Sequence, residues 1–204
     1  MTEVIKIADS EVLLDIEEFP YAKWKFDKFN PVQSSIVSNK IYETKDNIAI
    51  AAATSAGKTV MSELFMAHEV RKNKGKALYV GPLKALAKEK ELDWTDEGHH
   101  FYGLNISICT GDFRLTQRRV DELNNSDVIV MTPEMLASRC RNQESEKSHF
   151  LEQVGVIVFD ESHLLTVPNR GDHIEVALMK MVEINPNVRI VLLSATMPNV
   201  DEIC

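Results

Sequence analysis

The chain has 204 residues, of which 44% are hydrophobic and 26% charged, with a net charge of −8 at pH 7 and a pI near 5.3. This length fits one sizeable domain and excludes two full nucleotide-binding lobes, and no apolar run approaches the ~18 residues that a membrane span requires. The acidic balance argues against a protein that coats nucleic acid by bulk electrostatics, so any nucleic-acid contact is expected to be local.

The N-terminus and the cysteines together predict an intracellular protein. Residues Met1–Lys6 lack the apolar core of a signal peptide. Cys109, Cys140 and Cys204 are odd in number and widely spaced, which argues against a disulfide framework and a zinc site and fits a reducing compartment.

Residues 1–28 are mixed and acidic and are expected to form a lead-in, whereas residues 29–204 follow a regular pattern and are expected to form one lobe. Six apolar runs have the length of strands: Ile48–Ala53, Ala77–Val80, Ile106–Cys109, Val128–Met131, Val156–Phe159 and Ile190–Leu193. Segments with helical spacing separate them; one stripe comprises Ile174, Ala177, Leu178 and Met181. Strands that are apolar on both faces and alternate with amphipathic helices predict an α/β fold, in which a parallel sheet has helices on both faces.

A phosphate-binding loop is predicted over Ala52–Thr59, directly after the first strand. A tight loop that ends in Gly-Lys-Thr at the start of a helix offers backbone N–H groups and a partial positive charge to a polyphosphate. Lys58 would reach the β and γ phosphates, and Thr59 would ligate Mg²⁺. The other loop residues expected to contact the nucleotide are Thr54, Ser55, Ala56 and Gly57. The strict loop pattern has glycine at position 52, where this chain has alanine.

The second half of a Mg-nucleotide site is predicted at Asp160–His163, which follows the fifth apolar run. Asp160 would hold the same Mg²⁺, and Glu161 would orient and deprotonate the attacking water. Either motif taken singly has a plainer interpretation, a helix cap for the first and a solvated strand end for the second. Their joint occurrence, each behind an apolar strand, favours the nucleotide site.

Two further groups of polar residues lie near these motifs. Phe29 and Gln33 flank Pro31 at the start of a probable helix, and the Gln33 amide has the donor and acceptor that adenine requires. Ser194 and Thr196 follow the last strand, so their hydroxyls are expected near His163 and could relay the state of the γ phosphate. Ordinary surface glutamine and helix-capping hydroxyls are the alternatives.

Basic residues gather in two places, Lys84, Lys88 and Lys90 and then Arg114, Arg118 and Arg119. Charge alone favours two solvated helix faces over nucleic-acid sites.

The motifs together resemble those of superfamily 2 helicases, in the same order and all within the first RecA-like lobe. The segments that carry the resemblance are Phe29–Gln33, Ala53–Thr59, Pro82–Ala87, Thr110–Asp112, Thr132–Glu134, Asp160–His163 and Ser194–Thr196. Asp93–Trp94, Arg170–Gly171 and Glu175 are similar to the superkiller-type branch, which includes archaeal repair and spliceosomal RNA-unwinding helicases.

The resemblance implies roles for the individual positions. Gln33 is similar to the adenine-reading residue, Lys58 and Thr59 to the phosphate and Mg²⁺ residues, and Asp160 and Glu161 to the metal and water residues. His163, Ser194 and Thr196 resemble the set that couples hydrolysis to motion. Residues that resemble the loops gripping one nucleic-acid strand by its phosphates are Pro82, Leu83, Lys84, Thr110, Gly111, Thr132, Pro133 and Glu134. Such a grip through backbone and hydroxyl groups agrees with an acidic pI.

The resemblance also implies that ATP, Mg²⁺, a DNA or RNA strand and a second RecA-like lobe are the partners. The chain stops at Cys204, just past the Ser194 motif, so we expect a truncated first lobe that hydrolyses ATP poorly. Two other functions stay open from sequence: a single-lobe P-loop kinase or ATPase, and a non-catalytic module that docks nucleic acid or partners.

Overall fold

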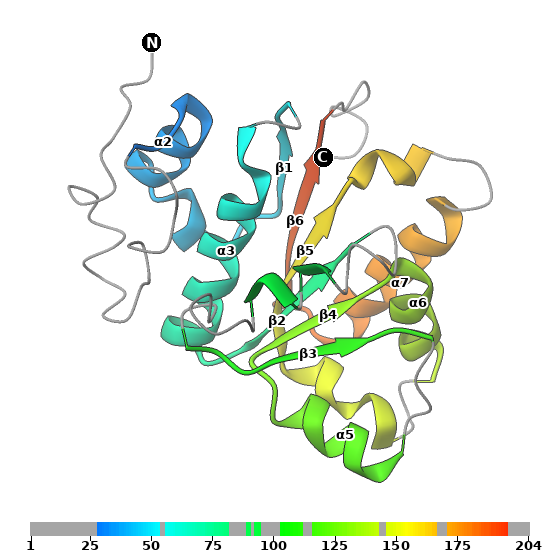
Figure 1. Cartoon of the computed structure of the whole chain (residues 1–204). Coiled ribbons are helices and arrows are strands. Elements are labelled where there is room, and N and C mark those ends of the chain that lie inside the picture. Colours follow the sequence, from blue (N-terminus) through cyan, green and yellow to red (C-terminus); the bar gives the residue numbers. More distant parts are fainter. Residues whose placement is uncertain are drawn as a thin grey trace.

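The computed structural model describes residues 28–53, 56–81, 89–90, 92–94, 103–111, 116–142, 146–166 and 171–195, and these residues form one parallel sheet with helices on both faces (Figure 1). The predicted lead-in lies outside this part of the chain except for Lys28. The sheet has six strands in the order β1-β6-β5-β2-β4-β3. The predicted α/β fold is therefore confirmed.

All six predicted strands are present, with ends that differ by one or two residues. They are β1 (Ile48–Ala51), β2 (Lys76–Val80), β3 (Ile106–Cys109), β4 (Val128–Met131), β5 (Val154–Asp160) and β6 (Arg189–Ser194). In the parallel register Ala51 lies beside Ser194, and Asp160 lies beside Leu193. The C-terminal ends of β1, β6 and β5 thus meet at one edge of the sheet, where parallel sheets bind their ligands.

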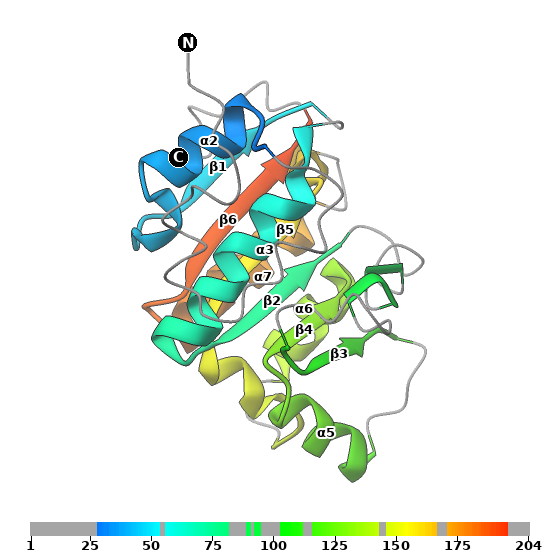
Figure 2. The same ribbon diagram turned by 60° about the vertical axis from the view of Figure 1, so that its left-hand side comes forward.

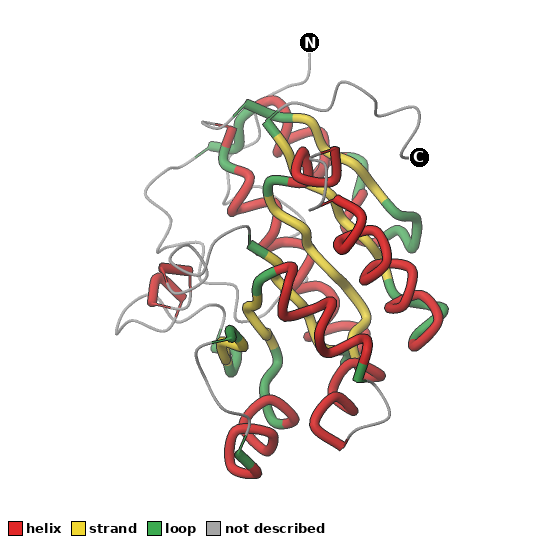
Figure 3. The backbone as a smooth tube through the Cα atoms, turned by 90° about the vertical axis from the view of Figure 1, so that its right-hand side faces the viewer, coloured by secondary structure: helices red, strands yellow, loops and turns green. Residues whose placement is uncertain are grey.

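The helices divide into two layers that Figures 2 and 3 show from different sides. Their bounds are α2 (Pro31–Ser38), α3 (Lys58–His68), α5 (Gln117–Asn124), α6 (Pro133–Arg141) and α7 (Gly171–Ile184). Short helical turns are η3 (Ile41–Glu43), η5 (Glu69–Asn73), η6 (Glu146–Gln153) and η7 (Ser162–Thr166). In Figure 2, α3 crosses in front of the sheet, while α6 and α7 lie behind it.

The core has two halves because successive residues of each strand point to opposite faces. Ala77 and Tyr79 of β2 pack in the half that contains α2 and α3, whereas Leu78 and Val80 pack in the half that contains α6 and α7. The predicted helical stripe is confirmed, since all four of its residues are buried in α7: Ile174, Ala177, Leu178 and Met181. Strands β2 and β4 are buried along their whole length.

Arg189 fastens the end of the sheet opposite to the motifs. Its guanidinium donates hydrogen bonds of 2.8–2.9 Å to the carbonyl groups of Ile41, Tyr42 and Asp46 and to the Thr44 hydroxyl. It also lies 4.8 Å from the ring centroid of a core aromatic residue of α3. Burial lowers the pKa of the guanidinium, although Asp46 opposes that effect. This one side chain therefore joins β6 to the turn that precedes β1.

Candidate nucleotide-binding site

Helix α3 begins at the predicted phosphate loop, and α2 holds that loop in place. Gly57 is the N-cap of α3 with φ +68°, a conformation that glycine adopts without steric cost. The Asn30 side chain donates to the Ala56 carbonyl at 2.6 Å, and the Gln33 side chain donates to the Gly57 carbonyl at 3.2 Å. Asn30 and Gln33 also form the capping box of α2, with Pro31 in its first turn as predicted.

Gln33 therefore has a task that sequence did not predict. Its residue is 3% exposed, its Oε1 accepts from the Asn30 backbone N–H at 3.1 Å, and its Nε2 contacts the carbonyl groups of Ala56 and Gly57. These bonds occupy the amide that an adenine contact would use. Phe29 has no exposed surface because it packs in the core, so it can affect a nucleotide only through the helix that it anchors.

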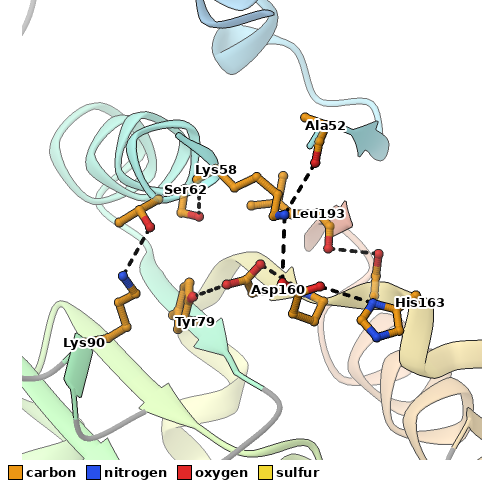
Figure 4. Close-up of polar contacts among 11 residues, drawn as sticks. Ala52, Lys58, Ser62, Tyr79, Lys90, Asp160, His163 and Leu193 are labelled. Atoms are coloured by element: carbon orange, nitrogen blue, oxygen red, sulfur yellow. Dashed lines mark hydrogen bonds and ion pairs between the residues drawn. The ribbon is translucent and has the colours of Figure 1, made fainter. Parts of the chain in front are cut away.

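Lys58 lies in the first turn of α3 and points toward the end of β5 (Figure 4). Its residue is 6% exposed, and its Nζ donates to the Ala52 carbonyl at 3.4 Å. The same Nζ lies 3.9 Å from Oε1 of Glu161. A largely buried ammonium is costly without anionic partners, so this position suits a phosphate. The two predicted halves of the site do meet.

Asp160 is the last residue of β5, and both of its carboxylate oxygens accept hydrogen bonds from other groups of the protein. Oδ2 accepts from the Tyr79 hydroxyl at 2.5 Å, and Oδ1 accepts from the Glu161 backbone N–H at 3.0 Å. Burial, followed by the charge and hydrogen bond of Asp160, raises the pKa of Tyr79 well above its ordinary value. Tyr79 is therefore protonated at every working pH and always donates this bond. The carboxylate is thereby oriented.

Glu161 is one of three described non-glycine residues with positive φ, at +56°. A side chain in this conformation is uncommon and often marks a functional position. Its carboxylate is shared, because Oε1 faces Lys58 and Oε2 lies 3.2 Å from His163 Nδ1. The turn thus presents Glu161 beside the Lys58 ammonium, while the His163 imidazole contacts the other oxygen of the carboxylate.

Two of the three predicted coupling residues, His163 and Ser194, are described, and they lie along the junction of β5 and β6. The Ser162 hydroxyl donates to the Leu193 carbonyl at 3.1 Å, and the Ala52 backbone N–H donates to the Ser194 carbonyl at 2.9 Å. Ser194 is fully buried, whereas the His163 side chain is 41% exposed. Strand β6 is therefore hydrogen-bonded to Ala52, which follows β1, and to the turn that follows Asp160.

Thr59 has an unexpected partner in Lys90, whose Nζ donates to its hydroxyl oxygen at 3.2 Å. The interpretation of the basic clusters as solvated faces is wrong for Lys90, because its side chain is only 13% exposed. It is also wrong for Arg119, which is 22% exposed and donates to the Ile108 carbonyl. It is correct for Arg118, whose side chain is 90% exposed.

The residues predicted to grip nucleic acid end β3 and begin α6. Thr110 is buried and Gly111 is exposed. The Thr132 hydroxyl caps α6 by accepting from a backbone N–H at 3.4 Å, Pro133 is buried, and Glu134 is exposed. The predicted site residues that lie outside the described part of the chain are Thr54, Ser55, Pro82, Leu83, Lys84 and Thr196.

The sequence did not predict that Tyr79, Lys90 and Glu63 lie near the candidate nucleotide-binding site. Trp94 contributed only to the resemblance to the superkiller-type branch. The Trp94 indole donates to Glu63 Oε1 at 3.0 Å, and its ring meets that of Tyr79 edge-on at 5.2 Å. A buried glutamate on α3 was the available signal, since Glu63 occupies a position in the apolar stripe of that helix.

Within the described residues, no group of three or more His, Cys, Asp or Glu side chains could hold a metal ion by itself. Cys109 and Cys140 are free and buried. The helices described are all too short or too polar to cross a membrane.

Comparison with known proteins identifies the family. The model of the DEAD/DEAH box helicase family matches residues 30–203. The chain belongs to this family. Its relatives are superkiller-type helicases of superfamily 2, as the motifs predicted, and the match covers the region of the first lobe.

Two curated relatives and one solved structure show the extent of the likeness. The ATP-dependent DNA helicase Hel308 of Methanocella arvoryzae is 35% identical over 198 residues, which are 96% of this chain and 25% of the relative. The ATP-dependent DNA helicase MER3 of Saccharomyces cerevisiae is 31% identical over 88% of this chain and 15% of its own length. The Mycobacterium smegmatis helicase Lhr, solved with single-stranded DNA and AMP-PNP, is 25% identical with a TM-score of 0.73, over 95% of this chain and 26% of that one. This chain therefore spans about a quarter or less of these helicases.

Proposed function

We propose that this chain is the ATP-binding motor lobe of an ATP-dependent helicase that moves on DNA or RNA. The observation that carries the proposal is the meeting of Lys58 and Glu161, whose Nζ and Oε1 atoms lie 3.9 Å apart although they belong to different motifs. The family membership and the nucleotide analogue in the Lhr structure support it.

The nucleotide would bind at the N-terminus of α3. Lys58 would contact the β and γ phosphates, with the backbone N–H groups of the loop and the helix dipole completing the anion site. Gln33 would contact the adenine, after releasing a loop carbonyl, and the loop residues Thr54, Ser55, Ala56 and Gly57 would surround the phosphates.

Thr59 and Asp160 would hold Mg²⁺, and their chemistry fits that ion. A hydroxyl and a carboxylate are hard oxygen ligands, and a Mg²⁺ site commonly uses only one or two protein carboxylates together with substrate phosphates. The fixed orientation of Asp160 by Tyr79 also suits a metal ligand. When bound, the ion neutralises phosphate charge.

Glu161 would orient the attacking water and accept its proton. The Glu161 carboxylate has one oxygen near Lys58 and the other near His163, which fixes its direction. His163 would act as a positioning residue, and with Ser194 and Thr196 it would pass the state of the γ phosphate to the rest of the protein.

A single nucleic-acid strand would cross the C-terminal ends of β3 and β4. The residues that we propose for this contact are Pro82, Leu83, Lys84, Thr110, Gly111, Thr132, Pro133 and Glu134. Exposed Gly111 offers backbone groups for phosphate contacts, which do not depend on base sequence. The single-stranded DNA in the Lhr structure supports nucleic-acid binding by a helicase of this fold.

Unwinding would require a second RecA-like lobe, because the motor acts by closing two lobes around ATP. The much greater length of the relatives supports such a partner. Since arginines from the second lobe would contribute roughly 10³–10⁵ in rate, this chain alone should hydrolyse ATP slowly. We also propose an intracellular location.

The test is Mg-ATP binding and hydrolysis by the chain, with and without single-stranded DNA or RNA. Lys58→Ala should weaken ATP binding by about tenfold or more, because a charged hydrogen bond contributes about 1.5–3 kcal/mol. Glu161→Gln should bind ATP and lose the residual turnover. Lys72→Ala, which removes an exposed lysine, is the matched control.

Two results would contradict the proposal. Unchanged ATP affinity in Lys58→Ala would favour a non-catalytic docking module. Rapid turnover that nucleic acid does not change would favour a single-lobe ATPase or kinase.

A further inference from the structure

Lys90 belongs to a helical turn whose described residues are 89–90 and 92–94. Its ammonium donates to the Thr59 hydroxyl at 3.2 Å and lies 3.9 Å from Oδ2 of Asp93. The Lys90 side chain is 13% exposed. The ammonium therefore extends from the turn to the first turn of α3 and not into solvent.

The same turn has a second connection to the nucleotide site. Trp94 donates its indole N–H to Glu63 of α3 at 3.0 Å and packs edge-on against Tyr79, with an interplanar angle of 89°. Tyr79 in turn donates to Asp160 at 2.5 Å. The turn is therefore joined to both residues proposed as Mg²⁺ ligands, to Thr59 through Lys90 and to Asp160 through the two aromatic rings.

The contact between Lys90 and Thr59 conflicts with metal ligation. A threonine oxygen has two lone pairs, so an ammonium and a metal cation that bind it together would lie side by side on this one atom. With both bound, two cations would share one small oxygen in a partly buried site, where screening by water is weak.

We propose that Lys90 competes with Mg²⁺ for the Thr59 hydroxyl, so that the turn with residues 89–90 and 92–94 is released when Mg-nucleotide binds. This inference rests on the proposed function, because it requires Mg-nucleotide at Thr59. Lys90 is then a positioning residue that lowers the affinity for Mg-nucleotide. Through Lys90, binding of Mg-nucleotide changes the position of the turn. This conformational change would occur beside β2, away from His163 and Ser194.

The inference is testable through the affinity for Mg-nucleotide. If Mg²⁺ must displace the Lys90 ammonium from Thr59, removing that ammonium should raise this affinity. AMP-PNP affinity is measured by calorimetry, once with excess Mg²⁺ and once with excess EDTA. With Mg²⁺, Lys90→Met should bind AMP-PNP about threefold to tenfold more tightly than the wild type, the range expected from losing one hydrogen bond. With EDTA, the two proteins should bind alike. Lys90→Arg keeps the charge and should resemble the wild type.

The matched control is Lys180→Met, which makes the same change of charge at an exposed lysine of α7. Lys180 also has an acidic partner three residues on, Glu183, as Lys90 has Asp93. This control should leave AMP-PNP affinity unchanged in both solutions.

Trp94 supplies a readout of the turn itself. The chain has two tryptophans, so in a Trp24→Phe background the emission comes from Trp94 alone. Mg-AMP-PNP should change this emission when Lys90 is present, and Lys90→Met should remove most of the change.

The outcomes separate this inference from the proposed function. If the wild type binds no AMP-PNP, the proposed function fails. If the wild type binds and Lys90→Met has equal Mg²⁺-dependent affinity, the competition is refuted. Weaker binding by Lys90→Met in both solutions would make Lys90 a phosphate contact and would also overturn it, as would an unaltered Trp94 response.

Discussion

The hydroxyl of Tyr79 donates a 2.5 Å hydrogen bond to Oδ2 of Asp160, which joins the central strand β2 to the C-terminal end of β5. Burial and the neighbouring carboxylates raise the pKa of Tyr79 well above its ordinary value, so the hydroxyl keeps the proton that it donates at neutral pH. The bond fixes the direction of the carboxylate, and it leaves Oδ1 facing the Glu161 turn.

Tyr79→Phe should lower the affinity for the Mg²⁺ that supports nucleotide binding. Loss of a bond that orients a metal ligand typically costs 10- to 100-fold in metal affinity, so about tenfold more Mg²⁺ should be needed. A Mg²⁺ titration of AMP-PNP affinity measures this shift. Tyr42→Phe is the control, because it removes another buried tyrosine hydroxyl, bonded to Glu43, at the other end of the sheet. A similar shift in both variants would contradict a specific role for Tyr79.

Gly57→Ala should impair the phosphate loop in two ways. A Cβ at Gly57 would lie 2.3 Å from Nε2 of Gln33, and φ is +68°. The strained φ alone should lower the free energy of unfolding by about 1–2 kcal/mol, and the clash should displace the loop and reduce AMP-PNP affinity.

Two variants separate these effects. Gly103→Ala at φ +66° repeats the backbone strain away from the loop and should leave AMP-PNP affinity intact. The double variant Gln33→Ala/Gly57→Ala removes the clash and should regain part of the stability. If Gly57→Ala bound AMP-PNP like the wild type, the geometry at Gln33 would not matter.

Arg189→Met should lower the free energy of unfolding by about 2–4 kcal/mol, because it leaves buried carbonyl groups of η3 and its neighbours without their donor. Arg189→Lys should cost less, since it keeps a charge and fewer bonds. Urea denaturation measures both. Arg118→Met removes a 90% exposed arginine and should cost less than about 1 kcal/mol. AMP-PNP affinity should be unchanged in all three variants. If Arg118→Met and Arg189→Met lowered the free energy of unfolding equally, Arg189 would not stabilise the junction of β6 with the turn before β1.

Burial raises the pKa of the Cys140 thiol to about 11 from 9.0. Well below pH 9 both the folded and unfolded chains keep this proton, so the thiol does not change stability there. Between pH 9 and about 11 the unfolded chain loses the proton first, so the free energy of unfolding falls as pH rises.

Other groups also titrate in this range, so the comparison needs Cys140→Ala. Between pH 8 and pH 10 the wild type should lose about 1 kcal/mol more than this variant in urea denaturation. In a Cys204→Ser background the native thiols should also react slowly with maleimide at pH 7. An identical pH response in both proteins would show that Cys140 does not contribute.

The apolar runs predicted the fold well because strand pairing in a parallel sheet requires local sequences that are apolar on both faces. The placement of Lys58, Asp160 and Glu161 followed from the same pattern, since each motif directly follows a strand and parallel strands end at one edge. The boundaries differed slightly; for example, β1 ends at Ala51.

Residues with contacts distant in sequence could not be predicted. Tyr79 reads as an ordinary core residue of a strand, yet its partner lies 81 positions away. Lys90 was interpreted as solvated because charge patterning describes one helix face and says nothing about what packs against it. Gln33 has the chemistry to read adenine, but only the packing of α2 against the loop brings its amide to Gly57.

The sequence by itself therefore determined the α/β class and the family and predicted the groups that we propose for Mg-ATP binding, because these depend on local periodicity and on short motifs. Only the tertiary structure decided which side chains orient those groups. Tyr79, Lys90 and Trp94 lie 31 or more positions from their partners Asp160, Thr59 and Glu63, and the packing of the sheet against α3 brings these pairs together.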